Sequence, residues 1–467
     1  MNTLFLPELL YTKGAFVRHG GLLIDDAGKV IDVGIRRDVT ADLVIELPGK
    51  CLLPGFVNAH SHSFQRLIRG KAESRIVSGK DFWSWRGTMY HAAAQLDEKD
   101  LFDVSRMAFL EMALAGTTTV GEFHYLHNMP DGSPYEDPNL LAKQVIAAAQ
   151  SVGIRIVLLR TAYIRSGFEL PRDIGQTRFF ESARDYLANT ERLTSEYSDE
   201  SLVQFGVAPH SIRAVPLEAI IEIADLSRSK NLPIHMHLSE QVAENTACAR
   251  EYGCTPIELL RRQKLLGPDF TAVHAIHISQ QEIATMAEAG ANICACPTTE
   301  RNLGDGVLAA DAVMSAGIPI ALGSDSQAQI DPLEDARELD YHLRLFHQER
   351  AILDQIDGEP LADRLFRCAT KNGAHAFSVP AGELEVASMA DFFTVDLDDV
   401  SIAGWNDESL LSNLVFSLQR TAIRDVAVNG KLIIRNGEHA LQEEIVGCYQ
   451  QVHDKVWRSR NPGRVKV

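Results

Sequence analysis

Eight short apolar runs, rich in Val and Ile and separated by longer amphipathic stretches, constrain the fold of this chain more than any other feature. An apolar run followed by a helical stretch is typical of a parallel strand and its crossover helix. Eight such units are the number that closes a barrel, so we predict an α/β fold built on a TIM-like (β/α)8 barrel. The runs cover residues 52–62, 116–125, 153–164, 201–211, 232–240, 270–279, 291–300 and 318–326.

A doubly wound open sheet is the alternative for the same pattern. That sheet would be expected to carry a glycine-rich phosphate turn after its first strand, whereas residues 58–62 read Asn-Ala-His-Ser-His. The stretches 137–152, 216–230 and 279–290 have helical periodicity, and the last ends at Gly290, as helices commonly do. The barrel is therefore the favoured interpretation.

The two ends of the chain have a different character, with short strands and turns. Asp-Asp-Ala-Gly at 25–28 separates two apolar runs, and the turn dipeptides Asn429-Gly430 and Asn436-Gly437 recur near the C-terminus. We expect both ends to pair into one small β-sandwich domain. The predicted division is residues 1–54 and 376–467 for that domain and 55–375 for the barrel.

The charge balance limits the partners of the chain. Its 467 residues include 45 Lys and Arg against 63 Asp and Glu, a formal net charge of −18, which argues against binding to nucleic acid or to an anionic membrane. No secretory signal and no apolar run of about 18 residues occurs. Seven irregularly spaced cysteines fit a reducing compartment, and we interpret Cys294 and Cys296 as small strand residues. We expect a cytoplasmic homodimer.

Polar residues collect where the apolar runs end, which in a barrel is the face that carries active sites. Residues two apart on a strand point the same way, so His60 and His62 can hold one ion. A single histidine is more often a core or surface residue, and we give that role to the others, His235 included. His or Asp residues nevertheless occur together at the ends of runs one, five, six and eight, and this joint occurrence predicts a metal centre. The residues collected are His60, His62, His210, His237, Glu240, His274 and Asp325.

These residues lie in segments that resemble the amidohydrolase superfamily: NAHSH, the H-x-x-E of HLSE, the later His274 and GSDS. The resemblance implies one metal ion held by His60, His62, His237 and Asp325. It also implies that His274 contacts the water or the substrate and that Glu240 moves protons. Binuclear members carry a bridging lysine, usually at the end of strand four, and residues 201–211 contain none.

Within the superfamily the chain resembles the formimidoylglutamate deiminases. That resemblance implies hydrolysis of N-formimino-L-glutamate to N-formyl-L-glutamate and ammonia, a step of histidine degradation. Nucleobase and thioadenosine deaminases share the metal pattern but usually lack the W-R and H-S-x-R segments. The segments that carry the resemblance are NAHSHSFQR, FWSWRGTMY, VGEFHYLH, APHSIR, HMHLSEQ, CPTTERNLGDG and GSDS.

The residue types suit this reaction. Hydrolysis of a formimino group needs a hydroxide at the carbon and a proton for the departing ammonia. A bound Zn²⁺, or alternatively Fe²⁺, lowers the pKa of water from about 15.7 to about 7. Asp325 or His274 would accept a proton and Glu240 would protonate the nitrogen.

A small dicarboxylate substrate needs forked donors in this acidic chain. Arg86 and Arg213 are the candidates, with Gln65, Tyr125 and His210 as neutral partners. Taken singly, Arg86 could be a surface residue on an aromatic patch and Arg213 part of an ion pair at a helix entry.

Two alternative functions remain for the whole chain. The first is a deaminase of a purine, pterin or triazine. The second is a non-catalytic barrel, which should have lost a metal ligand.

Overall fold

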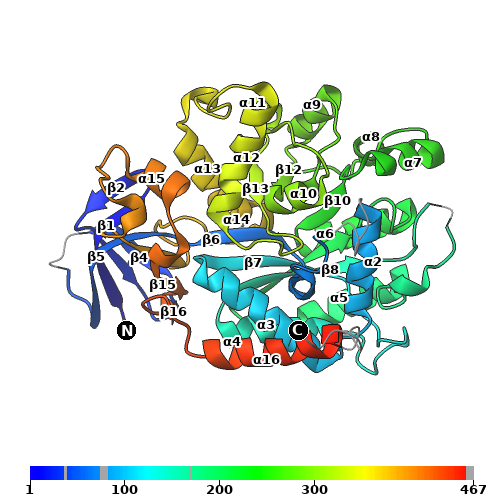
Figure 1. Cartoon of the computed structure of the whole chain (residues 1–467), viewed down its shortest axis with the longest axis horizontal. Coiled ribbons are helices and arrows are strands. Elements are labelled where there is room, and N and C mark those ends of the chain that lie inside the picture. Colours follow the sequence, from blue (N-terminus) through cyan, green and yellow to red (C-terminus); the bar gives the residue numbers. More distant parts are fainter. Residues whose placement is uncertain (36–38, 74–81, 169, 459–467) are drawn as a thin grey trace, which may run out of the picture.

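The computed structural model describes residues 1–35, 39–73, 82–168 and 170–458, with a barrel beside a smaller sheet (Figure 1). Eight parallel strands pair in chain order, and a bridge between Ser61 and Asp325 brings the last strand back to the first. This confirms the predicted barrel. The strands are β6 (Phe56–Ser61), β7 (Thr117–His124), β8 (Arg155–Ala162), β9 (Val203–Pro209), β10 (Ile234–Leu238), β11 (Phe270–His274), β12 (Asn292–Ala295) and β13 (Ile320–Leu322).

Two of the predicted runs divide between elements. The run 52–62 breaks at Gly55, where a Cβ would lie 2.2 Å from the Thr118 hydroxyl, so its first residues end a strand of the small sheet and the rest form β6. The run 291–300 leaves the strand at Cys296, because Pro297 begins helix α10 (Pro297–Leu303). The second break places the start of α10 where the barrel strands end.

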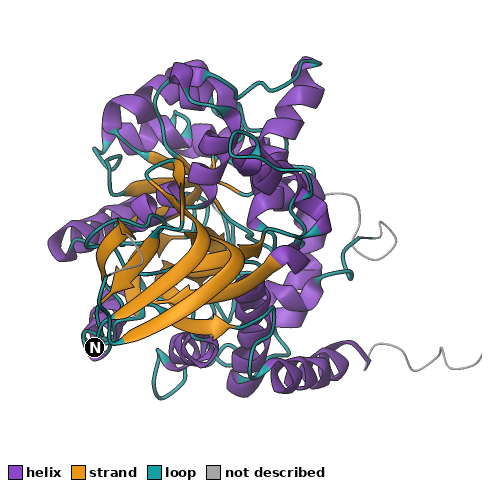
Figure 2. Cartoon of the chain, turned by 90° about the vertical axis from the view of Figure 1, so that its left-hand side faces the viewer, coloured by secondary structure: helices purple, strands orange, loops and turns teal. Residues whose placement is uncertain are grey.

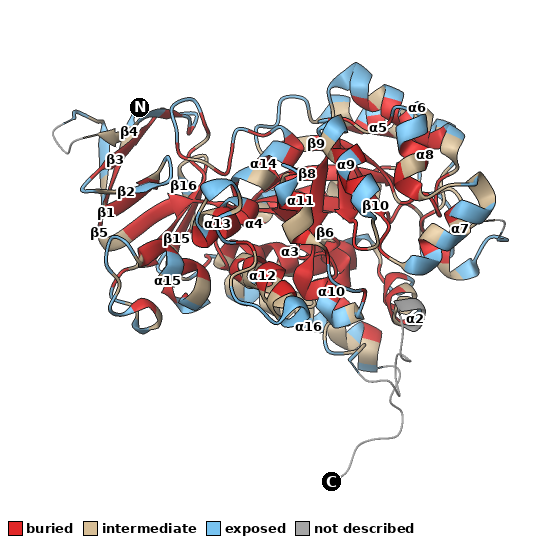
Figure 3. Cartoon of the chain, turned by 90° about the horizontal axis from the view of Figure 1, so that it is seen from above, coloured by how far each residue is buried: buried red, intermediate tan, exposed pale blue. Residues whose placement is uncertain are grey.

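Helices surround the barrel strands, whose residues are buried almost along their whole length (Figure 3). The periodic stretch 279–290 forms α9 with a capping box at Ser279 and a left-handed Gly290, as predicted. The helices are α2 (Phe82–Ala93), α3 (Glu98–Leu114), α4 (Leu140–Val152), α5 (Ala183–Glu196), α6 (Leu217–Lys230), α7 (Val242–Tyr252), α8 (Pro256–Arg262), α9 (Gln280–Ala289), α11 (Ala310–Ser315), α12 (Pro332–His347), α13 (Leu361–Ala369) and α14 (Lys371–Phe377).

Both chain ends contribute to the small sheet, which curves beside the barrel (Figure 2). The junction is β14, which runs antiparallel to β5. Alternate residues separate two faces: Leu52 and Phe392 pack within the sheet's own core, whereas Leu53 and Phe393 pack onto the barrel. The strands are β1 (Thr3–Thr12), β2 (Ala15–Arg18), β3 (Gly21–Ile24), β4 (Val30–Ile35), β5 (Leu43–Pro54), β14 (Phe392–Asp396), β15 (Ile423–Val428) and β16 (Lys431–Ile434).

The predicted turns hold: residues 25–28 join β3 to β4, and Asn429-Gly430 joins β15 to β16. Two helices follow in the same part of the chain, α15 (Leu410–Ser417) and α16 (Gln442–Trp457). Helix α16 packs along α3 of the barrel, a contact that the strand-and-turn pattern after residue 376 does not predict. In the described part of the chain, no helix combines the length and apolar character needed to cross a membrane.

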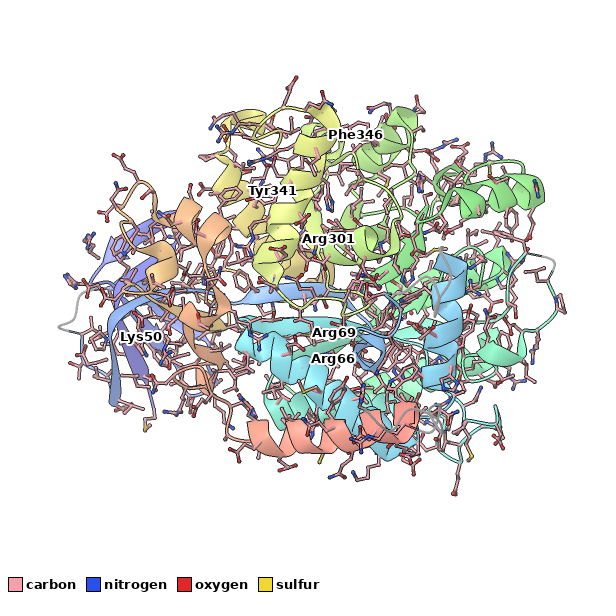
Figure 4. The ribbon with its side chains drawn as sticks, in the orientation of Figure 1. Lys50, Arg66, Arg69, Arg301, Tyr341 and Phe346 are labelled. Atoms are coloured by element: carbon pink, nitrogen blue, oxygen red, sulfur yellow. The ribbon has the colours of Figure 1, made fainter. Side chains whose placement is uncertain are left out.

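Short 3-10 turns complete the connections, and one of them, η1 (Ser63–Ile68), follows β6 directly. Arg66 within it and Arg69 just beyond it lie near each other (Figure 4). Both bond to Glu111 of α3. Arg69 also donates to the carbonyl of Gln327, which lies two residues after Asp325. The segment after the first strand is therefore tied to the segment after the last. The other 3-10 turns are η2 (Ile174–Gln176), η3 (Ile356–Gly358), η4 (Val400–Ile402) and η5 (Arg420–Ala422).

Candidate active site

Four buried side chains converge at the mouth of the barrel: His60 from β6, His62 just after it, His237 from β10 and Asp325 after β13. Nε2 of His62 lies 3.1 Å from Nε2 of His60 and 3.4 Å from Nε2 of His237. The Asp325 carboxylate lies 3.5 Å from His60 Nε2 and 3.2 Å from His62 Nε2. The structure thus brings all four predicted metal ligands to one point.

The hydrogen bonds behind two of these rings fix their tautomers. Nδ1 of His62 donates to the carbonyl of Phe123 at 2.9 Å, and Nδ1 of His237 donates to the carbonyl of His210 at 3.0 Å. Nε2 of each ring then carries a lone pair instead of a proton. The contact of 3.4 Å between these two nitrogens therefore places two hydrogen-bond acceptors against each other, which is repulsive. A cation at this point turns that repulsion into coordination, and carbonyl partners on Nδ1 are usual behind metal-bound histidines.

The electrostatics fit a divalent transition metal. Burial lowers the pKa of His60 to about 3 and holds the pKa of His237 well below its usual value, so both rings are neutral. Burial alone would raise the pKa of Asp325, but its bonds to His60 and His62 outweigh burial and lower that pKa well below the usual range. Three imidazoles and one carboxylate form a donor set that suits a single such ion.

Two predicted acid–base groups lie beside the ligands. His274 Nε2 lies 3.9 Å from Glu240 Oε1 and 3.9 Å from Asp325 Oδ2. Burial opposes the charge on His274, but Glu240, Glu300 and Asp325 outweigh it and raise the pKa of that imidazole well above its usual value. Burial raises the pKa of Glu240, although His274 and Arg213 partly oppose it. Both shifts favour the protonated form of the group.

One pocket joins these groups to every predicted substrate contact. Gln65 donates to the Tyr125 hydroxyl at 2.8 Å, and the Tyr125 ring centre lies 5.5 Å from that of His210. The pocket is lined by His62, Gln65, Trp85, Arg86, Met89, Tyr90, Tyr125, Tyr163, Phe179, His210, Arg213, His237, Glu240, His274, Leu303 and Asp325.

The pocket is lined by charged groups of both signs. Its carboxylates, Glu240 and Asp325, lie with the metal ligands, whereas its guanidinium groups come from Arg86 on α2 and Arg213 after β9. The Arg86 guanidinium lies 5.3 Å from the centre of the Tyr90 ring. Arg213 is buried in a chain whose net charge is −18. A molecule with a cationic end and an anionic end would match both the carboxylates and the guanidinium groups of this pocket.

Sequence comparison settles the family. The model of the amidohydrolase family matches residues 51–433. The chain belongs to that family. This amidohydrolase is 35% identical to a formimidoylglutamate deiminase of Pseudomonas aeruginosa over 97% of its own length and 99% of the relative. It is 26% identical to a 5-methylthioadenosine/S-adenosylhomocysteine deaminase of Pyrococcus abyssi over 92% of its length and 93% of that protein. It is a hydrolase acting on C–N bonds.

A solved structure supports the same assignment. The crystal structure of an amidohydrolase from Brucella melitensis superimposes on this one with a TM-score of 0.89 at 30% sequence identity, covering 97% of this chain and 99% of the other. The barrel and the small sheet are thus shared over almost the whole chain.

Sequence reasoning missed several residues that line the amidohydrolase pocket or lie directly behind it. Tyr163 follows β8 and could have been found by the rule that collected the other strand ends. Tyr90 and Phe179 lie on α2 and on the segment after η2, where no strand pattern marks them. Glu300 is buried on α10, with one oxygen 3.2 Å from His274 Nδ1.

Three other residues singled out in the sequence have packing roles. Arg160 of the third strand forms two bonds of 2.6 and 2.9 Å with Glu181 outside the pocket. His235 stacks on the Phe377 ring at 4.8 Å and bonds to a backbone carbonyl, which confirms its predicted core role. Cys294 lies buried within β12, as expected of a small strand residue.

Proposed function

We propose that this amidohydrolase hydrolyses N-formimino-L-glutamate to N-formyl-L-glutamate and ammonia. The observation that carries the proposal is the pair of guanidinium groups, of Arg86 and Arg213, in the same pocket as three of the four metal ligands. The substrate has the matching polarity, because its formimino group is cationic and its glutamate part has two carboxylates. Similarity to the Pseudomonas aeruginosa deiminase over nearly the whole chain agrees with it.

The proposed cofactor is one divalent transition metal ion, with Zn²⁺ as the first choice and Fe²⁺ as the second. His60, His62, His237 and Asp325 would hold it, and three nitrogens with one oxygen suit zinc. When bound, such an ion lowers the pKa of water to about 7 and so makes a nucleophile available at neutral pH. No lysine lies in residues 201–211 to bridge a second ion.

Three side chains of the pocket would each take part in a different proton transfer. Glu240 can carry a proton within the pocket and can donate it to the departing nitrogen. His274 lies within 3.9 Å of both Glu240 and Asp325, so it can pass a proton between the attacking and the leaving side. Asp325 is held ionised and can accept the first proton. Substrate bound by its carboxylates would be oriented with its formimino group toward these three residues.

A deaminase of a purine nucleoside is the second candidate, and the aromatic wall favours it. The Phe179 ring lies 5.0 Å from the Tyr125 ring and 5.4 Å from the Tyr163 ring, which is a surface on which a base could stack. A neutral nucleoside, however, has no carboxylate to match the positive charges of Arg86 and Arg213. The dicarboxylate is therefore the better match to the charge of the pocket.

Ammonia release distinguishes the two candidates. The zinc-loaded protein is assayed with N-formimino-L-glutamate, 5′-methylthioadenosine and guanine under the same conditions. We expect kcat/KM for the formimino compound to exceed that for either base compound at least a hundredfold. Faster turnover of the nucleoside or of guanine would overturn the proposal in favour of the second candidate.

A further inference from the structure

The two ring nitrogens of His274 face different surroundings. Nε2 faces the pocket, where Glu240 and Asp325 each lie 3.9 Å away. Nδ1 faces Glu300, whose Oε1 lies 3.2 Å away. Glu300 is 2% exposed and is not among the residues that line the pocket. It therefore contacts His274 from behind and does not reach a bound substrate.

The Glu300 carboxylate is itself held in place. It lies in the first turn of α10, which begins at Pro297 directly after β12. The oxygen that faces His274 also accepts the backbone N–H of Cys296 at 2.8 Å. An acceptor fixed at the start of a helix can direct a neighbouring ring as firmly as a backbone carbonyl directs His62 or His237.

The backbone at His274 has an unusual conformation. Its φ is 70°, and φ of the next residue, Ala275, is 52°, in the left-handed region that residues other than glycine rarely occupy. Conformations of this kind persist where surrounding contacts determine them, and they concentrate at functional sites. A ring at the end of this turn could rotate by half a turn and exchange its two nitrogens unless one of them has a fixed partner.

We propose that Glu300 is the positioning residue for His274: it accepts the Nδ1 proton, fixes the tautomer and keeps Nε2 directed at the reacting atoms. The inference rests on the role of His274 in the proposed function. Its rival is a second metal site, because donor atoms of His274, Cys296 and Glu300 lie within 4.8 Å of one another.

Two variants separate orientation from simple packing. In Glu300→Gln the amide oxygen can still accept both N–H groups, whereas Glu300→Met fills a similar volume with no such acceptor. Relative to the parent, we expect Glu300→Met to lower kcat by about 10–100-fold with KM changed less than threefold, and Glu300→Gln to recover most of that loss. Glu282→Gln is the matched control, since Glu282 also bonds a backbone N–H at a helix start, but on α9. It should lower stability at most and leave kcat unchanged.

A spectroscopic measurement tests the hydrogen bond without any substrate. With ¹⁵N-labelled histidine, the zinc-loaded parent should show a downfield Nδ1–H resonance that disappears in His274→Gln. The same resonance should persist in Glu300→Gln and disappear in Glu300→Met, with one metal ion per chain in every variant. Kinetics are measured on whichever substrate the parent hydrolyses, so failure of the formimino substrate overturns the proposed function and leaves this test intact.

Three results would overturn the inference. The first is a Glu300→Met protein that keeps kcat within threefold of the parent. The second is a His274 Nδ1–H resonance that persists in Glu300→Met. The third is two ions per parent chain with one lost in both Glu300 variants, which would assign these residues to a second metal site.

Discussion

Alternate side chains of residues 60–63 face in different directions and have different contacts. His60 and His62 face the metal position, whereas the hydroxyl groups of Ser61 and Ser63 each donate to the buried carboxylate of Glu122, at 2.6 and 2.7 Å. The Glu122 carboxylate also accepts the backbone N–H of Ser63 at 2.7 Å. One carboxylate on the second strand thus fixes the backbone that presents two ligands.

We predict that Glu122→Gln weakens metal binding by about 10–100-fold, because an amide cannot accept all three of these hydrogen bonds. Activity at saturating metal should recover to near the parent value. Competition with a chromogenic chelator measures the affinity. Asp391→Asn is the control, since Asp391 is equally buried but lies at the junction with the small sheet. Unchanged metal affinity in Glu122→Gln would show that the serine contacts do not position the ligands.

Glu244 gives a prediction for pH. Burial raises the pKa of this carboxyl to about 7, although Arg213 partly opposes the rise. The folded protein therefore keeps a proton that the unfolded chain loses near pH 4.5, so this group reduces stability progressively as pH rises from about 4.5 to about 7. Glu244→Gln should gain up to about 3 kcal/mol over the parent at pH 8 and almost nothing at pH 4. Urea unfolding of both proteins at the two pH values measures this difference, and an equal gain at both would contradict it.

Among the elements, α16 stabilises a segment near the pocket although it lies at the far end of the sequence. The indole N–H of Trp457 donates to the carbonyl of Leu67 at 3.1 Å, and the Tyr449 hydroxyl bonds to Arg66, so the last helix holds η1. Gln65 of the pocket lies on η1. The end of the chain therefore supports the segment that follows the first metal ligands.

The double variant Tyr449→Phe, Trp457→Phe tests this support. Each lost hydrogen bond should cost about 1 kcal/mol of stability. We also expect KM to rise about threefold to tenfold, because Gln65 loses its fixed position, while the metal content stays the same. Steady-state kinetics and metal analysis provide the measurements. If only the unfolding midpoint moves, α16 stabilises the barrel without influencing the pocket.

Sequence periodicity predicts elements better than their contacts. The eight strands and α9 follow from local patterns of apolar residues, caps and Gly290, which act within a few residues. The packing of α16 on η1 depends on residues almost four hundred positions apart and leaves no local pattern. The role of Glu300 also leaves no local pattern, because its partner His274 belongs to the preceding strand unit.

At the scale of the molecule, the rule that active sites lie at the ends of barrel strands carries most of the site prediction. It brings together His60, His62, His237 and Asp325 from three distant segments. It cannot find Phe179 or Tyr90, whose positions depend on how long connecting segments fold over the barrel. The metal centre is thus a property of the strand ends, and the pocket wall is a property of the tertiary fold.

A buried ion pair joins the barrel to the small sheet. Arg155 at the start of β8 bonds to Asp391 at 3.1 and 3.2 Å, and both side chains are 2% exposed or less. Arg155→Met should cost about 3–5 kcal/mol, because it leaves the Asp391 carboxylate buried without its partner. Adding Asp391→Asn should restore part of that loss. Chemical unfolding of the two single variants and the double variant measures the coupling, and strictly additive losses would contradict it.

The central claim is that Arg86 and Arg213 recognise the carboxylates of a substrate whose formimino group meets the metal centre. Its most direct test is the ratio of kcat/KM for N-formimino-L-glutamate to that for N-methylformamidine, in the parent and in Arg86→Ala and Arg213→Ala. We predict that each variant lowers kcat/KM for the dicarboxylate more than tenfold, a loss of about 2–5 kcal/mol, with metal content and the small amidine almost unaffected. Parent-like turnover of the dicarboxylate by both variants, or an equal loss with both substrates, would contradict the claim.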